Sequence, residues 1–236
     1  RFYLREYEQA QLAVSDLTAD FISALNAGAL IVNYAGHGSV NLWANERILD
    51  NRGGAYRSDL ENLRNKGKYP FVVNMACLTG YFIYPQAGLF AESSWRSLAE
   101  GWLWAEQSGA MGALMPTAMT APEGQQVLSG ALYEAIFAQD KRRLGEAVAY
   151  AKEQLLADGG AGYEPTAATF LLFADPATAL KLSRPYRPQG LSARTQADGT
   201  VGLAWSAATD GDGKPVAGYE LYRRTAAEKS YTKLNP

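Results

Sequence analysis

The chain has little of what several protein classes require. It contains one cysteine, so no disulfide can form within it and no cysteine-rich zinc site can be built. Its formal net charge is only -2, with both signs mixed along the chain, which gives no electrostatic reason to expect nucleic acid or an anionic membrane as partner. No apolar run approaches the roughly 20 residues that span a bilayer. We therefore expect no membrane-spanning segment.

The chain also lacks an initiator methionine, and residues 1–5 do not start a signal peptide. We expect that it begins inside a larger protein. Its 236 residues are enough for one large domain, or for one domain and part of another.

Two short apolar runs organise the first half of the chain. Residues 30–34 and 71–75 are rich in β-branched or aromatic side chains, as buried strands are. The only histidine, His37, follows the first run, and the only cysteine, Cys77, follows the second. Catalytic groups collect beyond the carboxyl ends of strands in open parallel sheets, so we expect the imidazole and the sulfur to be neighbours.

Helical patterns alternate with these strands. Apolar residues at a spacing of four predict a helix over 15–28, which Gly28 is placed to end. Residues 39–57 are polar and contain glycine, which is typical of a long loop, and Ser58 is placed to cap a short helix. This order implies right-handed crossovers and an α/β fold with a mostly parallel sheet flanked by helices.

The alternation continues beyond Cys77. Three further helices and one strand are expected. The helices are marked by Trp95, Leu98, Trp102 and Ala105, by Leu128, Leu132 and Ile136, and by Leu144, Val148, Ala151 and Leu155, and the strand covers 109–115 with an exit loop over 116–124. The apolar segment 170–173 is expected near the end of this domain.

The composition changes after a stiff proline-rich linker at 185–188. Segments 190–194, 201–205 and 219–223 alternate apolar with polar residues between turns, as the strands of an antiparallel β-sandwich do. Such a module needs about 100 residues, and only about half of that is present. We therefore expect two domains, 1–184 and a partial all-β module over 185–236.

His37 and Cys77 together suit nucleophilic catalysis. The thiolate attacks a carbonyl carbon, His37 carries the proton to the leaving amine, and the backbone N–H groups of Gly38 and Cys77 receive the oxyanion. Gly38 has no Cβ, so it allows close approach of substrate to the backbone and an unusual φ. Singly, the cysteine fits a small buried core residue and the histidine a turn residue. Their matching positions favour catalysis.

The other aromatic and acidic residues give weaker signals. Trp43 and Tyr56 are open to two interpretations, because they fit either the wall of a substrate cleft or a cover over the sheet edge. Trp95 and Trp102 fit the core. The Asp-Gly-Asp-Gly sequence at 210–213 resembles the start of a calcium loop but lacks the distal glutamate, so we expect a plain turn.

The residues around His37 and Cys77 carry a family resemblance. An apolar block ending in His-Gly, followed by one ending in Ala-Cys, is similar to the caspase-like clan of cysteine peptidases. Within that clan the chain resembles the gingipain family, from about residue 29 to 182. The resemblance rests on residues 33–39, Trp43, 70–82, 97–100, 109–113, 144–147 and 172–177. Residues 188–234 are similar to the fibronectin type III module that often follows such catalytic domains.

The resemblance implies a secreted or cell-surface bacterial cysteine endopeptidase that acts on proteins or peptides. It makes His37 and Cys77 the catalytic dyad, with Gly38 and Cys77 at the oxyanion. No cofactor is required for this chemistry, while calcium as a structural ion is implied without assignable ligands. The alternatives are a secreted peptidase-like binding or sorting scaffold without catalysis and an intracellular caspase-like peptidase.

The resemblance also suggests substrate-binding residues. The strand-exit loop with Met115, Pro116 and Thr117 corresponds to a wall of the substrate pocket, and Trp43 is a further candidate. The acids that orient the histidine and select Arg or Lys in the gingipains lie farther upstream than this chain extends. The apolar exit loop does not favour basic specificity.

Overall fold

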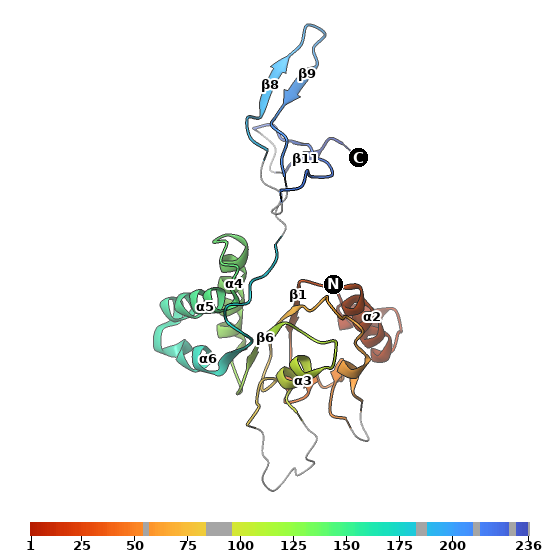
Figure 1. Ribbon diagram of the computed structural model, residues 1–236, viewed down its shortest axis with the longest axis vertical. Coiled ribbons are helices and arrows are strands. Elements are labelled where there is room, and N and C mark those ends of the chain that lie inside the picture. The colour runs from red at the N-terminus through yellow and green to blue at the C-terminus, as the bar shows by residue number, and fades with distance from the viewer. Residues whose placement is uncertain (54–56, 84–95, 183–187, 210–212, 227–229, 236) are drawn as a thin grey trace. The chain divides into compact units, whose positions relative to one another are not determined.

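The computed structural model describes residues 1–53, 57–83, 96–182, 188–209, 213–226 and 230–235. The chain forms two compact units, Arg1–Leu180 and Lys181–Pro236, whose elements are labelled in Figure 1. The helices of the first unit are α1 (Leu4–Gln9), α2 (Val14–Ala27), η1 (Asp59–Asn62), α3 (Leu98–Trp104), α4 (Pro122–Phe137), α5 (Leu144–Gly159), η2 (Gly160–Tyr163) and α6 (Glu164–Thr169). Its strands are β1 (Ile31–Ala35), β2 (Gly38–Ser39), β3 (Leu42–Trp43), β4 (Leu49–Asp50), β5 (Phe71–Met75), β6 (Gly112–Pro116) and β7 (Phe170–Phe173).

The central sheet of the first unit has the order β1-β5-β6-β7. Strands β1, β5 and β6 are parallel, and β7 is antiparallel to β6. The register pairs Ile31 with Phe71 and Ala35 with Met75, so β1 and β5 end level with each other. The expected α/β fold with a mostly parallel sheet is confirmed.

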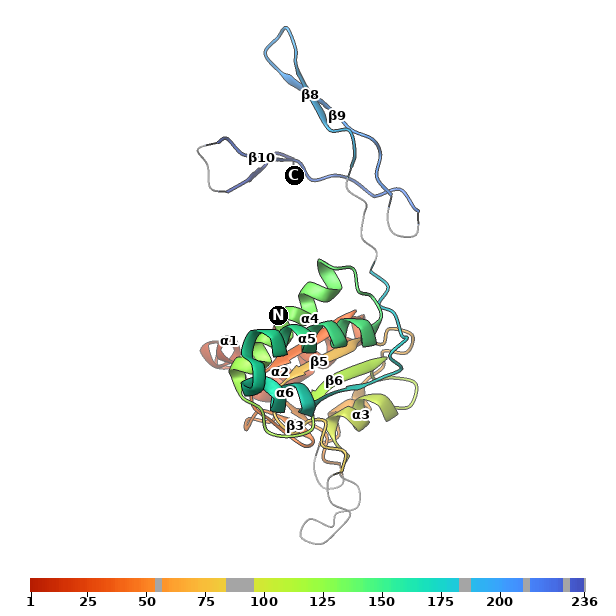
Figure 2. The same ribbon diagram turned by 90° about the vertical axis from the view of Figure 1, so that its left-hand side faces the viewer.

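Helices cover both faces of this sheet. Figures 1 and 2 place α4 and α5 on one face, with α2 and α3 on the other. On the α2 and α3 face, buried strand residues such as Val32, Val72 and Met115 join Leu25 and Trp102 in one apolar cluster. On the other face, α4 and α5 bury the residues that the helical spacing predicted, namely Leu128, Leu132, Ile136, Leu144, Val148, Ala151 and Leu155.

The expected long loop over 39–57 is wrong for its described part. Strands β2, β3 and β4 form a small antiparallel sheet within it. Val40, Trp43 and Leu49 are at most 7% exposed, so this segment is part of the core. Strands of two residues are too short to leave a periodic pattern, which explains why the sequence resembled a loop.

Two buried aspartates, each paired with an arginine, connect this small sheet to η1 through a hydrogen bond. The Asp50 carboxylate is 1% exposed and accepts hydrogen bonds from Arg52 Nε at 2.9 Å and Nη2 at 2.6 Å. Asp59 accepts from the Asp50 N–H at 2.7 Å and also pairs with Arg57. The Ser58 side chain, expected to cap a helix here, makes no capping bond to η1.

Two elements, β6 and α4, begin or end at other residues than the sequence predicts. Strand β6 begins at Gly112 rather than at 109 and continues through Pro116. Helix α4 begins at Pro122, inside the expected exit loop, with proline in its first turn. Because of both differences, the segment between the sheet and α4 begins only after Pro116.

The described part of the second unit contains two small antiparallel sheets. Strand β8 (Ser192–Thr195) pairs with β9 (Val201–Ala204), and β10 (Tyr222–Arg223) pairs with β11 (Thr232–Lys233). Trp205 and Tyr219 make an edge contact with centroids 5.2 Å apart. These strands overlap the three predicted segments, and the complete sandwich stays a prediction.

Some expectations fall on residues that the structure does not describe. They concern Tyr56, Trp95, the linker at 185–187 and the turn at 210–212. Among the described residues, no helix is both long and apolar enough to cross a membrane.

We expect Arg52→Met to lower the free energy of unfolding by about 2–4 kcal/mol near pH 7, since it leaves the buried Asp50 carboxylate without its cation. Burial raises the pKa of Asp50, but hydrogen bonds from Arg52 outweigh burial and hold this pKa below its usual 3.8. The stabilisation is therefore complete above that value and is lost as the pH falls through the lowered pKa. Urea unfolding at pH 7 and pH 3 measures both effects.

The control is Arg142→Met, because its partner Asp140 is 59% exposed and exposed pairs contribute only about 0–1 kcal/mol. Equal losses in the two variants at pH 7, or an Arg52→Met loss that does not shrink at pH 3, would contradict this account of the cluster.

Candidate active site

His37 and Cys77 occupy equivalent places past two neighbouring strands. Strand β1 ends at Ala35 and β5 at Met75, which are register partners. The N–H of Gly36 donates to the Met75 carbonyl at 3.1 Å, so the pairing continues one residue past β1. Each candidate therefore lies two residues beyond its strand, at the carboxyl edge of the sheet.

Gly38 brings the histidine segment into contact with the cysteine segment. A Cβ built on Gly38 would lie 2.9 Å from Ala76 Cβ, 2.9 Å from Thr79 Cγ2 and 3.0 Å from the Cys77 carbonyl oxygen. No side chain fits there without displacement. Gly38 is not among the positive-φ residues, so it does not use the unusual φ that glycine allows. Its contact with the cysteine segment explains the glycine, and the approach of substrate to it stays a prediction.

His37 and Cys77 line one pocket of about 660 Å³. His37 is exposed and Cys77 is partly buried. The other lining residues come from the ends of β1 and β5, from the segment between β6 and α4, and from the first half of α4. They are Asn33, Ala35, Gly36, Met75, Met119, Thr120, Pro122, Gln125, Gln126 and Ser129. None of these described lining residues carries a carboxylate.

Tyr34 holds the backbone of His37 by a hydrogen bond. Its hydroxyl donates to the His37 carbonyl at 2.7 Å, and its ring stacks on Trp43 with centroids 4.3 Å apart and planes at 1°. Burial, with the nearby charge of Glu46, raises the pKa of Tyr34 to about 12, so the phenol remains a donor at neutral pH. This role was not expected from the sequence, although an aromatic residue just before Ala-Gly-His was a signal for it.

None of the four residues expected to bind substrate is among the residues that line this pocket. Trp43 is 2% exposed and belongs to the core cluster with Trp102, so it does not wall the pocket. Met115 and Pro116 are buried in β6, and Thr117 hydrogen-bonds the Thr169 carbonyl through its side chain and backbone.

The strand explains this difference. Since β6 continues through Pro116, the chain leaves the sheet later than expected, and Met119 and Thr120 line the pocket instead. Met119 is 78% exposed, so it lies at the rim.

Two further residues hold the cysteine segment. Gln125 Nε2 donates to the Ala76 carbonyl at 3.0 Å, and Thr120 Oγ1 donates to the same oxygen at 3.1 Å. The Cys77 Sγ lies 3.7 Å from the Thr120 carbonyl oxygen. Gln125 precedes Leu128 and Leu132 on the buried stripe of α4, and a glutamine on an apolar stripe was the available sequence signal.

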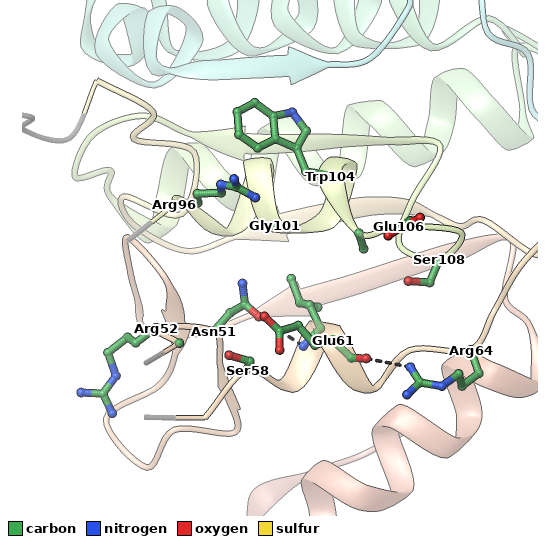
Figure 3. A pocket seen from close by; sticks show the side chains of 13 residues that line it. Asn51, Arg52, Ser58, Glu61, Arg64, Arg96, Gly101, Trp104, Glu106 and Ser108 are labelled. Carbon is green, nitrogen blue, oxygen red and sulfur yellow. Dashed lines mark hydrogen bonds between the residues drawn. The ribbon is translucent and has the colours of Figure 1, made fainter. Parts of the chain in front are cut away.

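A second pocket, of about 640 Å³, lies between η1 and α3 (Figure 3). Its arginines already have partners. Arg52 pairs with Asp50, Arg64 donates to the Glu61 and Leu63 carbonyls at 2.7 Å each, and Arg96 lies over the Trp104 ring at 4.3 Å. Neither His37 nor Cys77 lines it, so we assign it no part in the chemistry.

No metal-binding cluster is found in the described part of the chain. Nowhere in it do three or more histidine, cysteine, aspartate or glutamate side chains gather as metal ligands would. Calcium also accepts backbone and amide carbonyl oxygens as ligands, so the implied structural calcium stays a prediction.

The fold and the pocket define an α/β protein whose site lies at the carboxyl edge of a parallel sheet, with a thiol and an imidazole in one pocket. The model of peptidase family C25 matches residues 1–181. The chain belongs to this family.

Individual relatives agree with that membership. Gingipain R2 of Porphyromonas gingivalis is 30% identical over 82 residues, which are 35% of this chain and 10% of that protein. Gingipain R1 of the same organism is 30% identical over 82 residues, covering 35% of this chain and 8% of that protein. The matched part of the chain thus spans a tenth or less of these curated relatives.

Solved structures show the same fold. The crystal structure of the Arg-specific cysteine proteinase gingipain R (RgpB) matches with a TM-score of 0.61 at 20% identity, covering 76% of this chain and 39% of that one. The complex of the Porphyromonas gingivalis RgpB pro- and mature domains matches with a TM-score of 0.56 at 20% identity, covering 84% and 49%. The expected gingipain-like fold is confirmed for the first unit.

We expect Gly38→Ala to lower the free energy of unfolding by about 1–3 kcal/mol, because the added methyl meets three close neighbours in a packed segment. The matched control is Gly130→Ala in α4, where a Cβ meets nothing within 4 Å. There, alanine should stabilise by about 0.5–1 kcal/mol. Urea unfolding compares the two variants.

A Gly38→Ala protein as stable as the wild type would mean that the two segments do not touch as described. The control guards against a general effect of adding a methyl group.

Proposed function

We propose that this chain carries the catalytic residues of a cysteine endopeptidase that hydrolyses peptide bonds in proteins or peptides. One observation supports the proposal above the others: the only thiol and the only imidazole of the chain line one pocket at the ends of adjacent parallel strands. Membership of a peptidase family points to the same activity.

In this mechanism the Cys77 thiolate attacks the scissile carbonyl carbon. A C–S bond forms, the carbonyl π pair moves to oxygen, and His37 holds the thiol proton. Collapse of the tetrahedral intermediate breaks the C–N bond while His37 gives its proton to the leaving amine. Water, deprotonated by His37, then hydrolyses the thioester and restores the thiol. No cofactor takes part.

The oxyanion is proposed to accept hydrogen bonds from the backbone N–H groups of Gly38 and Cys77. The small sheet supports a role for Gly38. Because the Ala44 N–H donates to the His37 carbonyl at 2.8 Å, Gly38 and Trp43 form a non-hydrogen-bonded pair. The Gly38 N–H is therefore not used in pairing with β3.

The pocket lining bears on substrate preference. An arginine or lysine side chain would find no carboxylate among the described lining residues, so they do not favour the Arg specificity that names a solved relative. A peptide library that varies the residue before the scissile bond would measure which side chain the pocket prefers.

The rest of the proposal concerns the protein's setting. We propose a secreted or cell-surface bacterial protein, with 1–184 as the gingipain-like catalytic part and 185–236 as part of a fibronectin type III-like module. The antiparallel pairing of β8 with β9 supports the second assignment. Structural calcium remains part of the proposal, with its ligands unassigned.

Cys77→Ala and His37→Ala should each abolish hydrolysis of library peptides by the full-length parent protein, because the first removes the nucleophile and the second the proton carrier. The assay contains reductant and is run with and without calcium. Gln154→Ala, an exposed change on α5, controls for handling and should keep wild-type activity.

Circular dichroism must report folded variants. Full activity in both Cys77→Ala and His37→Ala would remove the assignment and leave a peptidase-like scaffold without catalysis.

Tyr34→Phe removes the hydrogen bond that holds the His37 carbonyl, without changing the stacked ring. We expect kcat to fall about 3- to 10-fold, in line with one hydrogen bond of about 0.5–1.5 kcal/mol, and KM to stay nearly constant. Tyr150→Phe removes a hydroxyl that bonds Glu134 away from the site and should leave both constants unchanged. Equal effects of the two variants would exclude a positioning role for Tyr34.

A further inference from the structure

The peptide unit between Ala76 and Cys77 contains two polar groups with different roles, a carbonyl and an N–H. Its carbonyl belongs to Ala76, and its N–H is one of the two proposed oxyanion donors. No described peptide bond is cis, and in a planar trans peptide the carbonyl and the N–H point in opposite directions. Whatever fixes the direction of the Ala76 carbonyl therefore also aims the Cys77 N–H.

Two side chains hold that carbonyl. Gln125 Nε2 donates to the Ala76 oxygen at 3.0 Å and to Thr120 Oγ1 at 2.7 Å. Thr120 Oγ1 in turn donates to the Ala76 oxygen at 3.1 Å. A carbonyl oxygen only accepts, so the amide nitrogen of Gln125 must face it. Both Gln125 N–H bonds are then used, and the three groups form a closed triangle.

Two members of this triangle are buried, and one of them lies on a helix. Gln125 is 9% exposed and Ala76 is 1% exposed. Gln125 lies in the first turn of α4, where its own N–H donates to the Ala121 carbonyl at 3.2 Å. Such a network holds its members in one arrangement, because an unpaired Gln125 amide or Ala76 carbonyl would be a buried polar group without a partner.

One backbone N–H group near the cysteine, that of Cys77, has no hydrogen-bond acceptor among the described residues. The Leu78 N–H donates to the Ala118 carbonyl at 3.2 Å, and the Cys77 sulfur lies against the Thr120 carbonyl. The Cys77 N–H makes no hydrogen bond to any residue in the described ranges. It is the donor that the triangle leaves for a ligand on the opposite side of the peptide.

We propose that Gln125 and Thr120 are positioning residues for the oxyanion hole: they fix and polarise the Ala76–Cys77 peptide so that the Cys77 N–H donates to the oxyanion. Hydrogen bonds accepted by a carbonyl strengthen the N–H of the same peptide as a donor. This role rests on the proposed peptidase function. Neither side chain is required to touch the reacting atoms.

The first test is Gln125→Met, which keeps the length of the side chain and removes its donor. We expect kcat to fall about 10- to 100-fold, below the 100- to 1,000-fold cost of deleting an oxyanion donor outright, with KM within about 2-fold. Gln154→Met, an exposed glutamine on α5, is the matched control. Thr120→Val should act in the same direction, and the double variant should lose less than the product of the two.

Inhibitor chemistry separates positioning from damage to the cysteine. A peptide aldehyde bonds Cys77 and develops its oxygen in the oxyanion hole, whereas iodoacetamide alkylates the sulfur without forming an oxyanion. Gln125→Met should weaken aldehyde binding about 10-fold or more and leave the alkylation rate within about 2-fold of wild type. Equal losses in both reactions would mean that the sulfur has moved, and would overturn the proposal.

Gln125→Glu supplies a rescue by pH. A glutamate has an ordinary pKa near 4.3, and only its protonated form can donate to the Ala76 carbonyl. Activity relative to wild type should therefore be low at pH 8 and rise as the pH falls toward 5. A constant ratio across this range would contradict the role of Gln125 as a donor.

The failure of this inference is distinguishable from the failure of the peptidase function. Wild-type protein that hydrolyses peptides, together with inactive Cys77→Ala, supports the function. If Gln125→Met then keeps its kcat within 2-fold of Gln154→Met, only the positioning role is overturned. A wild-type protein without activity overturns both.

Discussion

The parallel pairing of β1 with β5 is the constraint on which the site depends. Its register sets Ala35 opposite Met75, so the two strands release their chains at the same depth in the sheet. A slip of one residue would turn every side chain of β1 to the other face. The buried Val32 would leave the apolar cluster, and His37 would no longer be level with Cys77. The core thus enforces the alignment of His37 with Cys77 that the proposed chemistry requires.

The two halves of the site are supported from opposite faces of the sheet. Under His37, the Tyr34 hydroxyl and the Tyr34–Trp43 stack tie the backbone to the layer that contains α3. Beside Cys77, Gln125 and Thr120 tie the Ala76 carbonyl to α4. Gly38 joins the halves, since it has room only for a hydrogen where it meets Ala76 and Cys77. Each half is therefore fixed by a different layer of the fold.

Much of this arrangement was predictable from the sequence. The two apolar runs, the helical spacing of α2, α4 and α5, and the places of His37 and Cys77 all follow from local patterns. The small sheet of β2, β3 and β4 was not predictable, because two-residue strands have no period. Trp43 was open to two interpretations, the wall of a substrate cleft or a cover over the sheet edge, and its burial in the core cluster depends on that small sheet.

The supporting residues depend on contacts between distant segments. Met115 and Pro116 were expected at the pocket, but β6 retains them and the chain reaches the pocket only at Met119 and Thr120. Gln125 contacts Ala76 across 49 positions of sequence. A single sequence indicates that a glutamine interrupts an apolar helix face, but it does not indicate which carbonyl that glutamine meets.

The central claim is that Cys77 and His37 share one pocket whose backbone donors hold an oxyanion. A crystal structure of the protein with a bound peptide aldehyde tests it most directly. The account predicts a covalent bond from Cys77 Sγ to the aldehyde carbon, with the aldehyde oxygen about 2.7–3.1 Å from the backbone nitrogens of Gly38 and Cys77. An aldehyde bound elsewhere, or an oxygen directed away from both nitrogens, would contradict it.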